Sequence, residues 1–150
     1  MQKGEHALPS IFTRIINGEI PCHKILEDKK YFAFLDLRPV NPGHTLVIPK
    51  NEIDYFFDLD DTSIGGIMVF SRQVATALKK AVPCKKIGVM VAGLEVPHAH
   101  IHLIPVIESV HELAFAKAKS SSHEELAKMA EKIRRVWDSN PGTSFTQLTT

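Results

Sequence analysis

The sequence predicts an α+β fold, in which helices pack mainly on one face of an antiparallel sheet and a further helix ends the domain. Three observations predict it: a long amphipathic helical stretch in the middle of the chain, short apolar runs on either side of it, and a second amphipathic stretch near the C-terminus. The 150 residues suit a single compact domain.

A short helix is expected near the start of the chain. Ser10 stands where its side chain can cap the first amides, and Gly18 can adopt the left-handed conformation that ends a helix. Pro21 prevents the helix from continuing. We therefore expect a helix over residues 10–18, preceded by a flexible segment at residues 1–9.

Five apolar runs are expected to form strands, because each is bounded by turn residues. The charged triplet at residues 28–30 suits a hairpin turn between the first two strands. Residues 38–43 contain two prolines and a glycine, which predicts a loop before the third. The expected strands cover residues 22–27, 31–36, 44–49, 87–91 and 98–106.

The central stretch, residues 62–82, carries apolar residues at helical spacing. Asp61 or Thr62 is the expected cap of this helix, and Pro83 lies just past its end. A Ser-x-x-Glu pattern within residues 121–125 predicts the start of the C-terminal helix.

These elements define one domain over residues 10–138, followed by a flexible tail at residues 139–150. The composition favours a cytoplasmic protein that binds neither nucleic acid nor membranes. Lys and Arg number 18 against 17 Asp and Glu, so the basic excess that such partners require is missing. Cys22 and Cys84 form no Cys-x-x-Cys pair, and no apolar run is long enough for a signal peptide or a membrane span.

Three histidines on alternate residues, His98, His100 and His102, are the strongest functional signal. Alternate residues of a strand share one face, so the imidazoles are expected to line up while Ala99 and Ile101 face the core. If a carbonyl holds the Nδ1–H of one imidazole, the Nε2 lone pair is free to attack phosphorus. Neighbouring imidazoles can donate to phosphate oxygens or move protons. The row therefore predicts phosphoryl transfer on an extended anionic ligand, such as the phosphate chain of a nucleotide.

A metal site is the main alternative for these histidines. Zinc requires ligand nitrogens about 2.0–2.1 Å away, whereas the backbones of His98 and His102 are separated by roughly 13 Å at about 3.3 Å per residue. Two of the three histidines could still chelate one ion together with His44. We expect no metal and no other cofactor. The non-functional alternative is a row of solvent-facing histidines on an edge strand.

The signature of the histidine triad (HIT) superfamily, His-φ-His-φ-His-φ-φ with φ apolar, resembles the run from His98 to Ile104. The likeness extends upstream, where residues 11–21 resemble the family's opening helix and residues 32–50 resemble its second block. It covers roughly residues 10–106, and the C-terminal helix is compatible with bacterial members.

The resemblance implies cleavage of purine nucleotides at the α-phosphorus through a covalent nucleotidyl-histidine. The nucleophile would be His100, the middle histidine. His102 would contact the α-phosphate, and His98 together with His44 would order and shuttle protons around the nucleophile.

The resemblance also implies a nucleotide-binding set. Asp36 matches the acidic residue that binds the ribose hydroxyls, for which a carboxylate is a natural acceptor. Phe12, Phe34 and Leu37 match the apolar positions that enclose the base. Ordinary roles stay open for these residues: core packing for the apolar ones, a turn cap for Asp36, and a satisfied surface position for His44.

The sequence departs from the family pattern just before the triad. Family members usually carry Gln and then Ser or Thr after a glycine, whereas Leu94 and Glu95 follow Gly93 here. Glu95 either repels a phosphate or recognises a cationic amine leaving group, and it is included among the expected binding residues. Ser10 and Thr13 stand where zinc-binding members carry a Cys-x-x-Cys, so structural zinc is not expected.

The leading functional hypothesis is hydrolysis of a nucleoside monophosphate derivative, such as a nucleoside phosphoramidate or an aminoacyl adenylate. The alternatives are cleavage of dinucleoside polyphosphates by hydrolysis or phosphorolysis, a nucleotide-binding module with little turnover, and a metalloenzyme. Family members commonly form symmetric homodimers. The apolar stripe around Ile67, Met68 and Phe70 permits this, although core packing explains the same residues.

Overall fold

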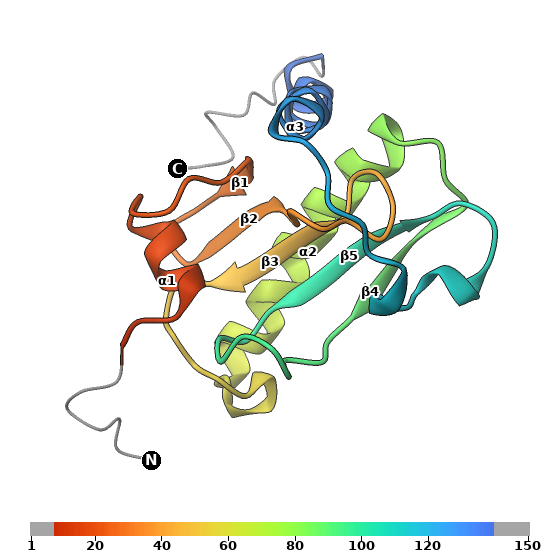
Figure 1. Cartoon of the computed structure of the whole chain (residues 1–150). Coiled ribbons are helices and arrows are strands. Elements are labelled where there is room, and N and C mark those ends of the chain that lie inside the picture. Colours follow the sequence, from red (N-terminus) through yellow and green to blue (C-terminus); the bar gives the residue numbers. More distant parts are fainter. Residues whose placement is uncertain (1–7, 140–150) are drawn as a thin grey trace.

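The computed structural model describes residues 8–139, which form a five-stranded antiparallel sheet with three α-helices (Figure 1). This is the α+β architecture that the sequence predicts. The strand order is β1-β2-β3-β5-β4. The flexible segments expected at the two ends fall largely on residues 1–7 and 140–150, which lie outside the described residues. The strands are β1 (Lys24–Glu27), β2 (Tyr31–Leu35), β3 (Thr45–Pro49), β4 (Lys86–Met90) and β5 (Ile101–Val106), and the helices are α1 (Ile11–Ile16), α2 (Asp61–Ala81) and α3 (His123–Asp138).

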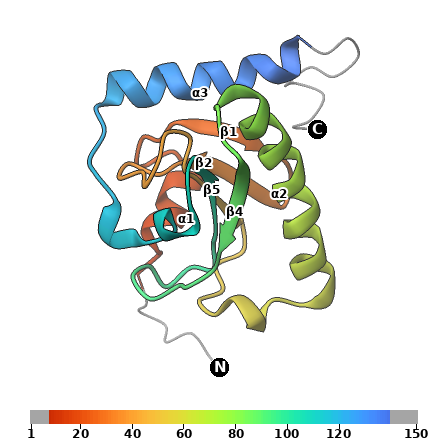
Figure 2. The same cartoon turned by 90° about the vertical axis from the view of Figure 1, so that its right-hand side faces the viewer.

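The sheet separates two layers of side chains (Figure 2). Helix α2 packs on one face, and α3 packs against α2 and β1. Helix α1 lies on the other face, together with the segment 107–122 that leads from β5 to α3. Alternate residues of β2 contribute to the two layers, because Leu35 packs in the α2 layer whereas Phe32 and Phe34 pack with Phe12 of α1.

The capping residues determine where α1 and α3 begin. Ser10 caps α1 by accepting a hydrogen bond from the amide of Thr13, and Gly18 has a φ of +78° past its end. Ser122 caps α3 by accepting from the amide of Glu125. Both helix starts agree with the sequence patterns.

The cap of α2 differs from the prediction. Asp60, and neither Asp61 nor Thr62, is the N-cap, and its carboxylate accepts from the amide of Ser63. Three successive residues there can each cap a helix. The spacing of apolar residues does not distinguish among them.

Strand β5 begins at Ile101, three residues later than expected. Its pairing with β3 ends where Val47 faces Ile101, and the next positions of β3 lead to Pro49. Pro49 has no N–H to donate to the ladder. The amide of Ala99 instead donates to the carbonyl of Ile53 at 2.7 Å. Before Ile101 the chain therefore bonds to the loop that follows β3, residues 50–55, and not to β3 itself.

The segment 107–122 crosses the α1 face of the sheet and was not assigned any structure from the sequence (Figure 1). It contains two short 3-10 helices, Val110–Glu112 and Phe115–Lys117. The amides of Lys119 and Ser121 tie it to the carbonyls of Pro39 and Leu37. Within residues 8–139, no helix has the length and hydropathy needed to cross a membrane.

Candidate active site

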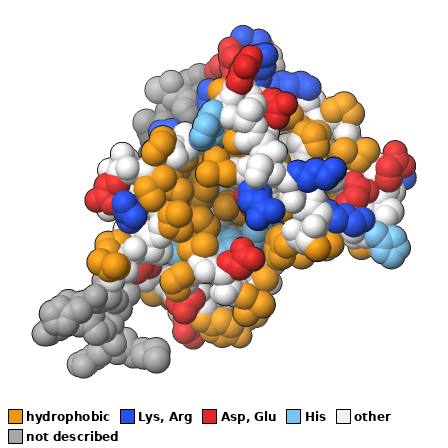
Figure 3. Space-filling view, viewed as in Figure 1, with side chains coloured by type: hydrophobic (Ala, Val, Ile, Leu, Met, Phe, Trp, Pro, Cys, Tyr) orange, Lys and Arg blue, Asp and Glu red, His pale blue; other side chains and the backbone are white. Residues whose placement is uncertain are grey.

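A pocket of about 440 Å³ opens on the α1 face of the sheet, a volume that suits a small-molecule ligand. Its floor comes from β2, β3 and β5, and its walls come from α1, residues 92–96 and residues 115–118. Figure 3 shows this face, with histidine surface near its middle between apolar and charged side chains. Eight of the nine site residues predicted from the sequence line the pocket: Phe12, Phe34, Asp36, Leu37, His44, Glu95, His100 and His102.

His100 is held by a backbone carbonyl. Its Nδ1 lies 2.7 Å from the carbonyl oxygen of His98, which can only accept, so Nδ1 carries the proton. In the neutral ring the Nε2 atom then keeps its lone pair. The ring of Phe12 meets that of His100 edge-on, with centroids 5.1 Å apart, and restricts its orientation.

His44 and His102 form a directed hydrogen-bonded pair. The amide of Val40 donates to Nδ1 of His44 at 3.0 Å, so the proton of the neutral His44 ring is on Nε2. That Nε2–H donates to Nδ1 of His102 at 2.9 Å. The proton of His102 is therefore on its own Nε2, so a neutral His102 presents a donor where His100 presents a lone pair.

Burial keeps this pair uncharged. The pKa of His102 is lowered to about 3, first by burial and then by the proximity of His100 and His44. Burial also lowers the pKa of His44, against the attraction of the Asp36 carboxylate, which favours protonation. Both imidazoles are therefore neutral near pH 7.

Asp36, His44 and His102 come close enough together to be considered as metal ligands, with one ligand atom from each within 4.8 Å of the others. The hydrogen bonds do not fit this use. A metal on Nε2 of His44 would replace the proton that lies between the two imidazoles, and a neutral ring would then need a proton on Nδ1. Nδ1 already accepts the amide of Val40. The donors and acceptors present are matched to a histidine pair and not to a cation.

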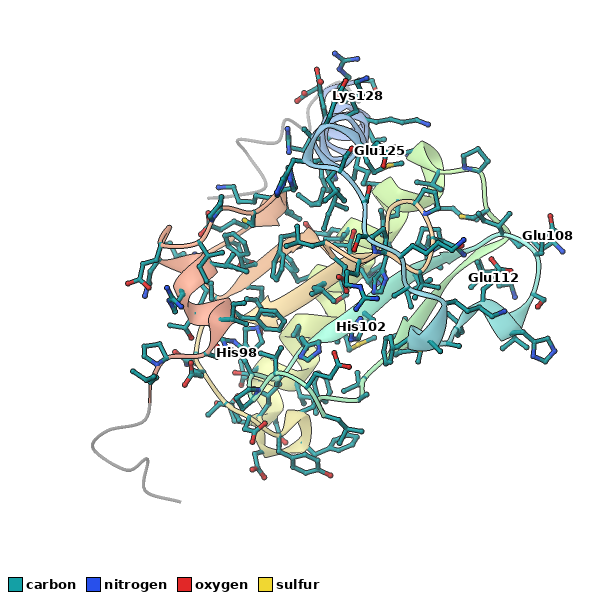
Figure 4. The ribbon with its side chains drawn as sticks, in the orientation of Figure 1. His98, His102, Glu108, Glu112, Glu125 and Lys128 are labelled. Carbon is teal, nitrogen blue, oxygen red and sulfur yellow. The ribbon has the colours of Figure 1, made fainter. Side chains whose placement is uncertain are left out.

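His98 has a different environment from the other two triad histidines. Its side chain is completely buried and does not line the pocket. Its Nε2 donates to the carbonyl of Pro49 at 2.8 Å, and its Nδ1 lies 2.7 Å from Oγ of Ser10. Figure 4 shows His98 beside α1 and His102 on β5. The three imidazoles therefore do not share one open face as expected, because the strand starts only at Ile101.

The apolar and acidic residues occupy distinct parts of the pocket. Phe12 and Phe34 are buried and meet edge-on, with ring centroids 5.5 Å apart, whereas Leu37 is half exposed. One carboxylate oxygen of Asp36 accepts the amide of Arg38 at 2.9 Å, and the other lies 3.6 Å from Nε2 of His44. Glu95 is exposed in the segment that forms one wall.

Ten of the lining residues are not among the nine predicted site residues, and they include Arg38, Phe115 and Ala118. The ring of Phe115 lies 4.6 Å from that of His102, centroid to centroid. Arg38 is next to Leu37 in the matched block, so its position could have suggested a role. Phe115 and Ala118 lie in a segment without periodicity, and no sequence signal indicates that it crosses the site.

The sheet, the pocket and the buried imidazoles define a domain that presents histidine nitrogens to a pocket of small-molecule size. The HIT domain model matches residues 17–109. An uncharacterized HIT-like protein from Methanocaldococcus jannaschii is 37% identical over 123 residues, which are 79% of this chain and 95% of that protein. The chain belongs to the HIT family.

Two further relatives add a structure and an activity name. A hypothetical histidine triad nucleotide-binding protein from Sulfolobus tokodaii superposes with a TM-score of 0.74 at 30% identity, covering 83% of this chain and 89% of that one. An adenosine 5′-monophosphoramidase from Schizosaccharomyces pombe is 36% identical over 100 residues, covering 63% of this chain and 72% of that protein.

Proposed function

We propose that this protein hydrolyses purine nucleoside 5′-phosphoramidates and related monophosphate derivatives through a covalent intermediate on His100. The observation that carries the proposal is the hydrogen bond between Nδ1 of His100 and the carbonyl of His98. It leaves a lone pair on Nε2 of a histidine that lines a pocket of nucleotide size. The name of the Schizosaccharomyces pombe relative supports the same substrate class.

The pocket suggests how a nucleotide lies in it. The base packs against Phe12, Phe34 and Leu37, and the ribose hydroxyls donate to the carboxylate of Asp36. The α-phosphate then lies near the imidazoles, where the Nε2–H of His102 donates to a nonbridging oxygen. A fixed donor in a largely water-excluded site stabilises the charge that develops in the transition state.

The reaction has two balanced steps. Nε2 of His100 attacks phosphorus, a P–N bond to the histidine forms, and the bond to the leaving amine breaks as the amine nitrogen takes a proton from solvent. The nucleotidyl-imidazolium retains its Nδ1–H, and the carbonyl of His98 stabilises its positive charge. Water then attacks phosphorus, AMP leaves, one proton returns to solvent, and His100 is restored.

A nucleotide-binding module with little turnover is the second candidate. The observation that favours it is the wall formed by Leu94 and Glu95, both exposed, where polar donors to a phosphate or leaving group are usual in the family. Glu95 adds negative charge beside an anionic ligand, which weakens binding of a phosphate unless the leaving group is cationic.

The two candidates differ in one assay. The protein is mixed with the adenosine 5′-phosphoramidate of a primary amine, and AMP and free amine are quantified by chromatography. We expect equal amounts of both products, and a loss of about a thousandfold or more in kcat for His100→Ala. His111→Ala is the control, because His111 is exposed outside the pocket. Binding of AMP by calorimetry without any AMP release would overturn the proposal in favour of the binding module.

A further inference from the structure

The side chain of His98 does not line the pocket, and its hydrogen bonds to Pro49 and Ser10 point away from it. Pro49 provides only an acceptor, so Nε2 of His98 carries a proton, and Nδ1 of the neutral ring accepts the hydroxyl hydrogen of Ser10. Only the backbone carbonyl of His98 faces the chemistry, where it holds Nδ1 of His100. Whatever fixes the position of His98 therefore also fixes the tautomer and direction of His100.

The hydrogen bonds of Ser10 lead to a carboxylate. Oε1 of Glu52 accepts the backbone amide of Ser10, and it accepts the hydroxyl of Thr13 at 2.7 Å. The Ser10 hydroxyl oxygen also accepts the amide of Thr13 as the cap of α1. Glu52 thus binds the first turn of α1 at the two residues that lie within 3.5 Å of Nδ1 of His98.

The same loop also holds the backbone of the triad. Ile53, the residue after Glu52, accepts the amide of Ala99 at 2.7 Å. The amide of Ala99 belongs to the same peptide unit as the His98 carbonyl, so Ile53 holds that unit directly. Glu52 holds it indirectly, because it binds Ser10, whose hydroxyl is the hydrogen-bond partner of the His98 side chain. Such two-point attachment determines the direction of a carbonyl far better than a single contact does.

Helix α1 depends on this attachment. It has only six residues, too few to be stable in isolation. Its Phe12 packs on the rings of both His98 and His100, with centroids 5.8 and 5.1 Å away. The carboxylate of Glu52 therefore links the helix that forms the apolar wall with the carbonyl that holds the nucleophile.

We propose that Glu52 is a positioning residue, which acts through Ser10, Thr13 and His98 to hold the nucleophile His100 in the tautomer and direction that attack phosphorus. This inference rests on the proposed function for its kinetic part, but the state of His100 can be measured without any turnover. The network acts through hydrogen bonds alone, and no covalent bond is made or broken in it.

The test compares Glu52→Ala and Ser10→Ala with two conservative variants, Ser10→Thr and Thr13→Ser, in the full chain. We expect kcat for the phosphoramidate to fall by about 10–100-fold in the alanine variants, since misplacement of a reacting group by about 1 Å can cost that much. The dissociation constant of AMP should change by less than about threefold. Ser10→Thr and Thr13→Ser each keep the hydroxyl, so these variants should retain most of the kcat of the unmodified protein. Glu19→Gln is the control, because Glu19 is an exposed carboxylate beside α1 that pairs with Arg14.

The second readout is the ¹⁵N NMR spectrum of the histidine side chains, which reports the tautomer of His100 directly. The unmodified protein should show the Nδ1–H form, and the alanine variants should show a mixture of tautomers. Alanine variants that keep both the Nδ1–H form and full kcat would overturn the inference. So would a parallel loss of kcat, AMP binding and melting temperature with an unchanged tautomer, which a purely structural role predicts. If the unmodified protein has no turnover, the proposed function fails while the tautomer measurement still decides this inference.

Discussion

Nε2 of His44 lies 2.9 Å from Nδ1 of His102, and the amide of Val40 donates to the opposite nitrogen of His44. These two contacts give the pair a direction, because the amide can only donate and each neutral imidazole carries one proton. His102 is thereby a donor toward the pocket. His100, held by a carbonyl, is an electron-pair donor in the same pocket. Two identical side chains thus have opposite roles, set by their backbone partners.

The direction of this pair can be tested at His44. His44→Leu removes the donor to His102, whose ring can then place its proton on Nδ1 and lose the donor toward phosphate. We expect a fall in kcat of about 10–100-fold. His44→Gln, whose amide can donate in place of the imidazole, should retain more activity. Equal rates of AMP release for His44→Leu and the unmodified protein, with both folded by urea titration, would show that the pair has no such role.

The pair also predicts how stability depends on pH. The ordinary pKa of His102 is 6.5 and its pKa in the folded protein is about 3, so between these values the unfolded state binds more protons. Stability is therefore complete above about pH 6.5 and decreases as the pH falls toward 3. From about pH 6.5 to pH 5 the loss from this group is about 2 kcal/mol of the free energy of unfolding.

Urea unfolding at the two pH values measures this loss. His102→Gln removes the titrating group, and its free energy of unfolding should decrease by about 2 kcal/mol less over the same interval. His23 also has a lowered pKa, but it pairs with His123 and remains in both proteins, so its contribution cancels. His44 is hydrogen-bonded to His102, so the difference between the two proteins reports the titration of this pair. The same pH dependence in both proteins would mean that His102 titrates normally in the folded state.

Glu95 gives a prediction about the leaving group. An exposed carboxylate in the pocket wall attracts a leaving group that carries a positive charge, and it does not attract an uncharged one. We expect the adenosine phosphoramidate of ethylenediamine to exceed that of butylamine in kcat/KM by about fivefold at low salt, less at high salt. Glu95→Gln should abolish the preference. If Glu95→Gln keeps the preference for the charged amine, Glu95 is not the cause of the selectivity.

The homodimer expected from the family remains a prediction, and the structure narrows the residues that could form it. Ile67 and Phe70 are buried in the core, which leaves Met68 exposed on α2. β4 is an edge strand, and its Val89 is half exposed. Sedimentation should give about twice the 16.7 kDa chain mass, and Val89→Lys should give a monomer. A monomeric unmodified protein at micromolar concentration would exclude this dimer.

Local patterns were sufficient to predict most of the fold. The cap at Ser10 and the turn at Gly18 depend on neighbouring residues only, and both were predicted. The start of β5 was not, because it depends on Pro49, which lies in another strand and has no N–H to pair with. The positions of the triad histidines show the same difference. His100 and His102 line the pocket and could be predicted from the sequence, whereas the position of His98 depends on its contact with Ser10, far away in the chain.

The site was predicted where its residues lie in regular elements or in the matched family blocks. Asp36, His44, His100 and His102 come together in one pocket, as do the apolar residues around them. Phe115 could not be predicted, since it reaches His102 from a segment with neither helical nor strand periodicity. Glu52 could not be predicted either. Its contacts with α1 are fixed only when residues far apart in the sequence pack together.

The covalent intermediate on His100 is tested most directly by the mass of the protein after brief mixing with an adenosine phosphoramidate and acid-free quenching. Fragmentation of the product then locates the modified residue. We expect one added nucleoside monophosphate group on His100, which disappears with time as AMP is released and is missing in His100→Ala. Release of AMP by a protein that never carries the adduct, or an adduct that persists in His100→Ala, would contradict this mechanism.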